Sequence, residues 1–320
     1  MDRGEHESEV DNVPSIAILI LEHDENDPPC YALDFLTEFC NNYNDRMQAG
    51  SGASMLPVVR VVYYQLWREG GRSLLPTNVK NQRIMADGTQ PIGLASDSCE
   101  GSQAMKVGAI LSCGGDLSAN DEEKHKYFRD VKRLFSSAIE HQIPVFAICL
   151  GCQLLVQALG GSVVPMHTAE LGWSDLALDS NLCTPSPTEV SSMLKPWFSD
   201  EAKQKDTVRF FQFHSDTWTL PSGCHLLASS SVCRNQAFQF RDQYVIGTQF
   251  HCESDAAKAK VWAEYGHPGF QMNPHDHIVP QKVILDTADE EAAHSCKEMH
   301  HMLTTWVQGI ALPKVPKRSG

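Results

Sequence analysis

The sequence contains no long hydrophobic run and has fewer basic than acidic residues. No apolar stretch approaches the roughly 20 residues that a membrane-spanning helix needs. Lysine and arginine total 26 against 40 aspartates and glutamates, which gives a net charge of −14 at pH 7. A surface of this charge repels the phosphates of nucleic acids and the headgroups of anionic membranes. We therefore expect neither nucleic acid nor membrane as a partner.

Targeting and metal-binding patterns are lacking as well. Residues 1–13 are acidic and polar, unlike a signal or transit peptide, and we expect them to be a disordered leader. The eleven cysteines lack the spacing of a small disulfide-rich domain, and the late histidines have no partners at zinc-finger spacing. These histidines are His275, His277, His294, His300 and His301. We therefore expect free thiols, a cytosolic location and no metal ion.

The first half of the chain alternates between strand-like and helix-like segments. With 320 residues, 42% of them hydrophobic, the chain is long enough to bury a sizeable core. This alternation predicts an α/β fold with a doubly wound, mainly parallel sheet. The strands are expected at 15–21, 58–64 and 107–112, and the helices at 31–42 and 121–141.

The pattern changes after residue 173 to short strands separated by turns. These strands are expected at 175–178, 208–214, 224–230, 237–240 and 244–250, with helices following at 256–265 and 290–310. Earlier in the chain, residues 66–106 have little periodicity, which predicts an insertion within a domain that spans 14–312. Residues 313–320 form a basic tail that we expect to be frayed.

Cys149 stands at a predicted break between a strand and a helix. The apolar residues 144–148 precede it, and the helix-like run that follows ends at Gly160-Gly161. A sulfur at this point meets the free N–H groups and the positive dipole end of a helix, which stabilise a thiolate and hold an oxyanion. Free cysteine is often only a small buried hydrophobe. Taken alone, Cys149 is therefore consistent with a structural role or with a nucleophile.

A second signal lies at the end of the last predicted strand, where the sequence reads Phe250-His251-Cys252-Glu253. His251 and Glu253 are two positions apart, so at a strand end their side chains point the same way. A thiol nucleophile needs a base, and the base needs an acceptor that orients it. We therefore predict a triad of Cys149, His251 and Glu253.

A competing interpretation comes from Cys149-Leu150-Gly151-Cys152, which is a C-x-x-C sequence of the thioredoxin-like redox type. The His-Glu pair has no role in disulfide exchange, which counts against redox chemistry as the main function. A regulatory disulfide between Cys149 and Cys152 stays open, because it requires only that the two sulfurs face each other.

Together these motifs resemble the class I glutamine amidotransferase family, and most closely its stand-alone branch of GMP-synthase-like and γ-glutamyl peptidase-like proteins. Cys149, Gly151 and Gln153 are in register with the family's G-x-C-x-G-x-Q elbow. The His-Glu pair is in register with its F-H-P-E segment. Further similar segments lie at 111–118, 170–173, 213–218 and 228–238, so the resemblance runs from about 14 to 265.

The resemblance implies a flavodoxin-like three-layer α/β/α sandwich with a small antiparallel addition. It also implies hydrolysis of a γ-glutamyl amide through a cysteine thioester, with no metal or organic cofactor. The backbone N–H groups of Gly115 and Leu150 would form the oxyanion hole. The residues expected to bind the substrate are Gln153, Gly114, His214 and Asp216. As alternatives to these roles, Gly114-Gly115 is an ordinary tight turn and the other positions are polar surface residues that bind no substrate.

Three residues depart from the family pattern, which bears on catalytic efficiency more than on the assignment. Cys252, Asp116 and Ala147 replace two prolines and a glycine of the family, and the lost proline at Cys252 removes a constraint on the His-Glu turn.

The resemblance leaves three functions open. One candidate function is that of a glutaminase subunit that supplies ammonia to a separate synthetase, since no P-loop is found in the chain. A second is a free-standing γ-glutamyl peptidase. A third is a non-catalytic scaffold that keeps only the fold.

Overall fold

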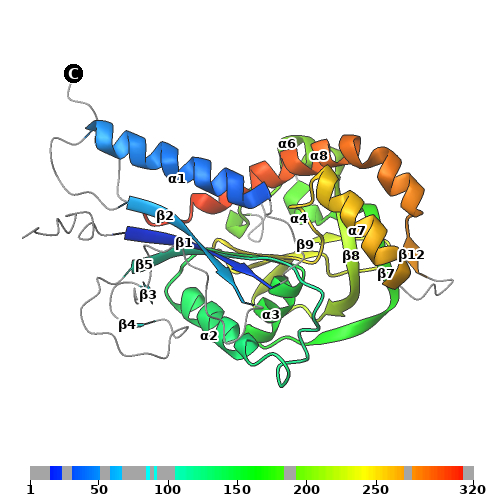
Figure 1. Cartoon of the computed structure of the whole chain (residues 1–320), viewed down its shortest axis with the longest axis horizontal. Helices are drawn as coiled ribbons and strands as arrows, with labels where there is room; N and C mark the ends of the chain where they lie inside the picture. The colour runs from blue at the N-terminus through cyan, green and yellow to red at the C-terminus, as the bar shows by residue number, and fades with distance from the viewer. Residues whose placement is uncertain are drawn as a thin grey trace, which may run out of the picture.

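The computed structural model describes residues 15–23, 31–50, 58–66, 84–86, 90–91, 105–183, 192–269 and 276–312. A mixed β-sheet runs through the middle of the molecule, with helices on both of its faces (Figure 1). This confirms the α/β fold that the sequence pattern predicts and the three-layer, flavodoxin-like sandwich that the family resemblance implies. The expected leader and basic tail, and most of the expected insertion at 66–106, lie outside the described residues.

Five parallel strands form one half of the sheet. In spatial order they are β2 (Val58–Gln65), β1 (Ser15–Glu22), β5 (Met105–Ser112), β6 (Val145–Ile148) and β11 (Val245–Thr248). The carboxyl ends of parallel strands meet at one edge, which is where α/β proteins place their sites. The segments that follow β5, β6 and β11 therefore meet at this edge of the sheet.

The antiparallel addition continues the sheet beyond β11 and is larger than the sequence predicts. Its strands are β10 (Ala237–Phe240), β9 (Cys224–Ser229), β7 (Val163–Leu178) and β8 (Thr207–Trp218), with the short β12 (His277–Ile278) beside β7. Strand β7 begins twelve residues before the expected start at 175. Residues 164–168 of β7 are mostly exposed, so they lack the alternation that marks a half-buried strand.

The continuous apolar run of β1 is buried on both faces of the sheet. Ile16, Ile18 and Ile20 belong to one core cluster, whereas alternate residues such as Leu19 and Leu21 belong to another. This is the arrangement that an unbroken hydrophobic run predicts for a central parallel strand.

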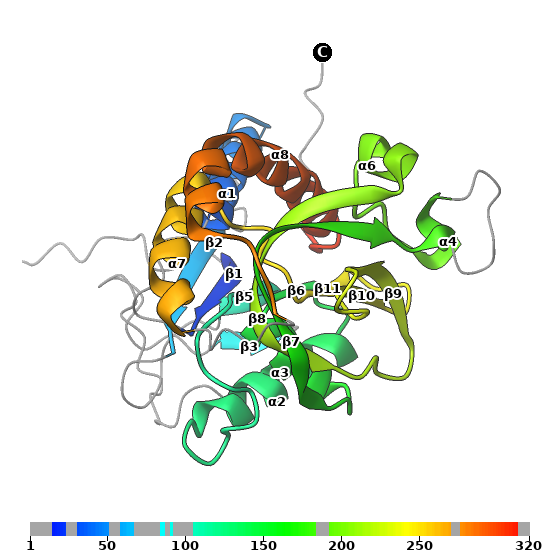
Figure 2. The same cartoon turned by 90° about the vertical axis from the view of Figure 1, so that its right-hand side faces the viewer.

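Helices cover each of these clusters, on opposite sides of the sheet (Figures 1 and 2). Helices α1 (Tyr31–Gly50) and α8 (Gln281–Val307) cover the first, and α2 (Tyr127–Glu140) and α3 (Leu150–Ala158) cover the second. The remaining helices are α4 (Ser180–Cys183), α6 (Asp200–Lys205) and α7 (Ala256–Gly269), and the short strands β3 (Ile84–Ala86) and β4 (Gln90–Pro91) complete the described elements.

Two helices begin at other residues than the sequence predicts. Helix α2 begins at Tyr127 rather than at 121, because residues 121–126 form turns in which acidic side chains bind Arg129 and Lys132 of the helix. Helix α8 begins at Gln281 rather than at 290. Among residues 281–289, which precede the expected start, only Ile284 and Ala288 are buried. The apolar stripe of this part of the helix is therefore too narrow to recognise from the sequence.

A third core cluster joins α7 and α8 to the β7–β8 hairpin. It contains Trp173 from β7, Phe211 from β8, Trp262 from α7 and Ile284 from α8. This packing fixes α7 beside the carboxyl edge of the parallel strands, and it thereby supplies one wall of the candidate site. None of the helices in the described ranges has the length and apolar character needed to cross a membrane.

Candidate active site

Cys149 occupies a sharp turn between β6 and α3. Its backbone has φ +48° and ψ −109°, a region that residues other than glycine rarely adopt. The turn is held on both sides, because the Cys149 N–H donates to the Thr248 carbonyl at 2.8 Å and its own carbonyl accepts from the Gln153 N–H at 2.9 Å. A strained backbone of this kind costs about 1–3 kcal/mol and is concentrated at functional sites.

Gly151 allows the turn to lie close to the neighbouring strand. A Cβ atom at this position would come within 2.6 Å of the Ser112 carbonyl oxygen at the end of β5. The Gly151 N–H donates to the Cys113 carbonyl at 3.1 Å. The glycine two residues after the cysteine is therefore required by close backbone approach, which is a physical reason for the motif that the sequence shows.

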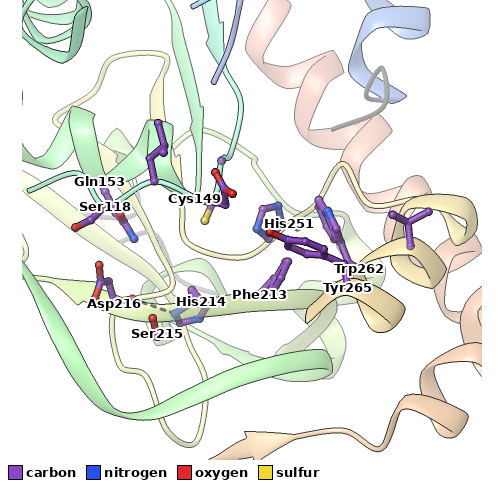
Figure 3. Close-up of a pocket in the computed structure, with 14 residues that line it drawn as sticks. Ser118, Cys149, Gln153, Phe213, His214, Ser215, Asp216, His251, Trp262 and Tyr265 are labelled. Atoms are coloured by element: carbon purple, nitrogen blue, oxygen red, sulfur yellow. Dashed lines mark hydrogen bonds between the residues drawn. The ribbon is translucent and has the colours of Figure 1, made fainter. Parts of the chain in front are cut away.

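His251 and Glu253 lie just after β11 and form a buried hydrogen bond. The Nδ1–H of His251 donates to Glu253 Oε1 at 2.8 Å, and both side chains are almost wholly inaccessible to solvent. The backbone N–H of His251 donates a 2.8 Å hydrogen bond to the Phe211 carbonyl of β8, which fixes the backbone at His251. Among the described residues, Nε2 of His251 has no nitrogen or oxygen partner, and the His251 ring interacts with the Cys149 sulfur, which lies beside it at the cavity (Figure 3).

Charge at the site favours a protonated His251. Burial by itself would lower the pKa of His251, but its interactions with the Glu253 carboxylate and the Cys149 sulfur outweigh burial and raise the pKa to about 10. Burial opposes the ionised form of Glu253 too, yet His251 and the buried Lys258 keep the Glu253 pKa below its usual value. The arrangement therefore holds a proton on the imidazole beside the sulfur.

The Gly114-Gly115 turn lies against both Cys149 and His251. A Cβ atom on Gly114 would be 2.8 Å from Cε1 of His251 and 3.4 Å from Cβ of Cys149. A Cβ atom on Gly115 would be 3.0 Å from the Leu150 side chain. Leu150 is the first residue of α3, so its N–H has no carbonyl partner within the helix. Gly115 and Leu150, whose N–H groups are the predicted oxyanion donors, are thus neighbours, and Leu150 directly follows Cys149.

A cavity of about 500 Å³ opens in front of the Cys149 sulfur. Figure 3 shows that its two ends differ in character. Ser118, Gln153, Ser215 and Asp216 form a polar end on one side of Cys149, and Phe213, Trp262 and Tyr265 lie on the side of His251. The complete lining is Gly115, Asp116, Leu117, Ser118, Cys149, Gln153, Phe213, His214, Ser215, Asp216, His251, Val261, Trp262 and Tyr265.

The structure places the predicted substrate residues at or beside this cavity. Gln153 and Asp216 line it directly, and Gly114 flanks it. His214 also lines it, but both ring nitrogens of His214 face protein acceptors. Nδ1 is 3.0 Å from the Asp216 carbonyl, and Nε2 is 3.1 Å from both the Glu170 and Gln212 side-chain oxygens. His214 therefore shapes the 214–216 segment rather than offering a nitrogen to the cavity.

The placement of Cys152 gives no support to the redox alternative. Its side chain is fully buried in the core on the α3 side of the sheet, and its sulfur lies close to Gly247 of β11, where a Cβ atom would be only 2.8 Å away. Burial, together with the nearby Cys149, raises the pKa of Cys152 well above its usual value. Since thiol exchange needs a thiolate, a buried thiol held in its neutral form is a poor partner for Cys149.

The lost proline at Cys252 has not opened the His-Glu turn. Cys252 is fully buried in the core, and the His251–Glu253 hydrogen bond on either side of it is short. Ala147, which replaces a glycine, is buried in β6 opposite Gly247 and faces away from the site. Asp116 remains at the exposed rim of the cavity. None of the three departures disturbs the geometry of Cys149 and His251.

Sequence reasoning missed the wall that α7 contributes. Trp262 packs edge-on against His251 with ring centroids 4.4 Å apart, and Val261 and Tyr265 line the cavity beside it. The sequence predicts the helix but assigns these residues no role. The signal that could have indicated them is the group of apolar and aromatic residues in the first helix that follows the His-Glu motif. In the parts of the chain that the structure describes, no group of three or more His, Cys, Asp or Glu side chains could hold a metal ion.

The fold and site define an α/β protein with a candidate cysteine–histidine–glutamate centre at the carboxyl edge of a parallel sheet. Comparison with known proteins agrees with this class. Residues 99–261 match the family model for "Glutamine amidotransferase class-I". Because this match covers just over half of the chain, the protein belongs to the class I glutamine amidotransferase family.

Relatives in this family include GMP synthases. The chain is 33% identical over 151 residues to a glutamine-hydrolyzing GMP synthase of Streptococcus mutans, an alignment that covers 46% of the chain and 25% of that protein. It is 29% identical over 146 residues to one subunit of the glutamine-hydrolyzing GMP synthase of Methanocaldococcus jannaschii, which covers 46% of the chain and 64% of the relative. The chain thus matches less than two thirds of the length of each relative.

Solved structures of the same fold cover nearly the whole chain. A glutamine amidotransferase from Methylobacillus flagellatus superposes with a TM-score of 0.65 at 22% identity, over 95% of this chain and 99% of that one. A second, from Thermotoga maritima, has a TM-score of 0.59 at 20% identity, over 92% and 98% of the two chains. At these identities the likeness establishes the shared fold.

Proposed function

We propose that this protein hydrolyses the γ-amide of glutamine or of a γ-glutamyl compound through a thioester on Cys149. One observation carries the proposal. The Cys149 sulfur, on a strained strand–helix turn, faces a buried histidine that is oriented by a 2.8 Å hydrogen bond to Glu253, at the opening of a cavity. Membership of a glutamine amidotransferase family supports the choice of substrate.

The first half of the reaction forms the thioester. The Cys149 sulfur, as thiolate, attacks the side-chain carbonyl carbon of the substrate, and the carbonyl oxygen becomes an oxyanion. The N–H groups of Gly115 and Leu150 stabilise this charge, which is the largest single contribution in many acyl-transfer enzymes. The carbon–nitrogen bond then breaks as His251 gives its proton to the departing nitrogen. Ammonia or an amine leaves, and the γ-glutamyl group stays on Cys149.

The second half releases glutamate. His251, now neutral, takes a proton from water as the water oxygen attacks the thioester carbon. Collapse of the second tetrahedral intermediate breaks the carbon–sulfur bond and restores the thiolate beside a protonated His251. Glu253 holds the imidazole in one orientation and stabilises its positive charge throughout. The sum is one amide and one water converted to glutamate and an amine.

The direct test is product release by the purified, reduced protein. Glutamate formation would be measured separately with glutamine and with γ-glutamylglycine at neutral pH. We expect steady turnover of at least one of them, because the two substrates share the same acyl-enzyme. Absence of glutamate from both substrates would contradict hydrolysis by the isolated chain and would favour a synthetase-dependent subunit or the non-catalytic scaffold.

A second candidate is a glutaminase subunit that works with a synthetase. It is favoured by one observation, the similarity to a relative that is itself one subunit of a GMP synthase. The two candidates use the same thioester chemistry and differ in the fate of the nitrogen. Turnover of glutamine that rises strongly when a co-purified synthetase is added would favour this second candidate. Full activity of the isolated chain on γ-glutamyl amides would favour the first.

A further inference from the structure

The orientation of a substrate in the cavity follows from the proposed chemistry, on which this inference rests. The scissile carbon must lie next to the Cys149 sulfur, and the departing nitrogen must lie next to His251, which protonates it. The glutamyl group therefore extends from Cys149 away from His251. Whatever substituent the nitrogen carries extends past His251 in the opposite direction.

The polar end of the cavity suits the glutamyl group. Gln153, Ser215 and Asp216 lie on the side of Cys149 away from His251 (Figure 3). A γ-glutamyl group ends in an α-ammonium and an α-carboxylate, which need charged or hydrogen-bonding partners when they leave water. The Asp216 carboxylate provides a partner for the ammonium, and the hydroxyl and amide groups provide donors for the carboxylate.

The opposite end is apolar and partly open. Trp262 packs on His251, and its ring lies 5.8 Å from that of Phe213. Two further residues of α7 extend this surface, with Val261 49% exposed and Tyr265 63% exposed. Of the six exposed large hydrophobic side chains in the described residues, these two line the cavity. The four residues Phe213, Val261, Trp262 and Tyr265 are named the leaving-group wall.

Ammonia makes no use of such a wall. It is small and strongly hydrated, so glutamine hydrolysis alone gives no reason for large apolar side chains on the side where the amine departs. An apolar or aromatic substituent on the nitrogen would cover Val261 and Tyr265 and would stack against aromatic rings, and both effects favour binding.

We propose that the leaving-group wall selects γ-glutamyl amides whose nitrogen carries an aromatic or large apolar group, in preference to glutamine. Such substrates include γ-glutamyl derivatives of aromatic amines and amino acids. The reaction remains the hydrolysis described above, with the substituted amine in place of ammonia as the leaving group. Tyr265 and Val261 are thereby assigned as specificity-determining residues.

The test compares γ-glutamylphenylalanine with γ-glutamylglycine, which differ only in the apolar group. For the wild-type protein we expect kcat/KM to be roughly tenfold higher or more for the phenylalanine compound, the size usual for a well-placed apolar contact. Replacing Tyr265 with alanine is expected to lower this ratio several-fold. Tyr265→Phe, which keeps the ring, is expected to preserve it.

Two further variants separate selectivity from general damage. Asp216→Asn acts on the shared glutamyl group, so it is expected to lower kcat/KM for both compounds alike and leave their ratio unchanged. Val283→Ser alters an exposed valine of α8 that does not line the cavity, so it is expected to change neither value. Equal kcat/KM for the two compounds, or a ratio that Tyr265→Ala leaves intact, would overturn the inference.

A binding measurement keeps this inference distinct from the proposed function. Calorimetric titration of the Cys149→Ala protein measures affinity without turnover. One outcome is that the Cys149→Ala protein binds γ-glutamylphenylalanine more tightly than γ-glutamylglycine while the wild type turns over neither. This outcome would support the selectivity of the leaving-group wall and contradict the proposed hydrolysis. Turnover of both compounds with equal affinity would support the hydrolysis and contradict the wall. Neither turnover nor a difference in affinity would contradict both.

Discussion

Replacing Cys149 with alanine is expected to lower turnover of the best γ-glutamyl substrate by at least about a thousandfold. The sulfur is the only atom at this turn that can form the acyl intermediate, and the histidine beside it has nothing to activate once it is gone. The measurement is glutamate release per enzyme under saturating substrate, with folding checked by circular dichroism and thermal unfolding.

Cys296→Ala is the matched control for this substitution. Cys296 is a free, partly buried cysteine on α8 that does not line the cavity. The Cys296→Ala substitution removes a thiol of the same size outside the cavity, so turnover is expected to match the wild type. A Cys149→Ala protein that retained turnover would show that another group performs the chemistry.

Replacing Glu253 with glutamine is expected to lower kcat by roughly a hundredfold or more, because a neutral amide no longer holds the imidazole in its working tautomer or stabilises its positive charge. The substitution keeps the size of the side chain and one oxygen. It therefore removes mainly the charge that His251 faces at 2.8 Å.

The pH dependence of this variant follows from the same charge. In the wild type the interactions of His251 with Glu253 and the Cys149 sulfur overcome burial and raise the pKa of His251 to about 10. The proton that His251 gives to the leaving amine is present below that pKa and is lost as the pH rises through it. Activity should thus persist well above the usual histidine pKa of about 6.5. In Glu253→Gln the alkaline fall of kcat/KM should move to lower pH.

Glu298→Gln is the control for a buried glutamate outside the site. Glu298 accepts hydrogen bonds from Ser199 at the start of α6, on a different part of the molecule. Its replacement by glutamine is expected to leave the alkaline limb of the pH profile in place. An unchanged profile in Glu253→Gln would mean that Glu253 does not govern the His251 proton.

The arrangement of Cys149, His251 and Glu253 could be predicted from sequence because each part of it is local. Cys149 lies at the turn between β6 and α3, and His251 and Glu253 are only two residues apart in the turn that follows β11. The parallel order of β6 and β11 then brings these segments side by side, as it does in any sheet of this topology. No long-range side-chain packing had to be known.

The proposed substrate-binding part of the site depends on packing that no short pattern records. Trp262 and Tyr265 reach the cavity because α7 packs against the β7–β8 hairpin and α8, through segments far apart in the chain. The role of His214 depends on Glu170, whose buried carboxylate also accepts a hydrogen bond from Gln236 at 2.7 Å. Polar residues of this kind look like ordinary surface positions until their burial is known.

The most direct test of the central claim is the mass of the Cys149 peptide after a rapid acid quench during turnover of γ-glutamylphenylalanine or glutamine. The account predicts a γ-glutamyl group on that peptide, bound as a thioester that hydroxylamine removes, and no adduct in the Cys149→Ala protein. Turnover accompanied by an adduct on another residue, or by none under conditions that stabilise thioesters, would contradict it.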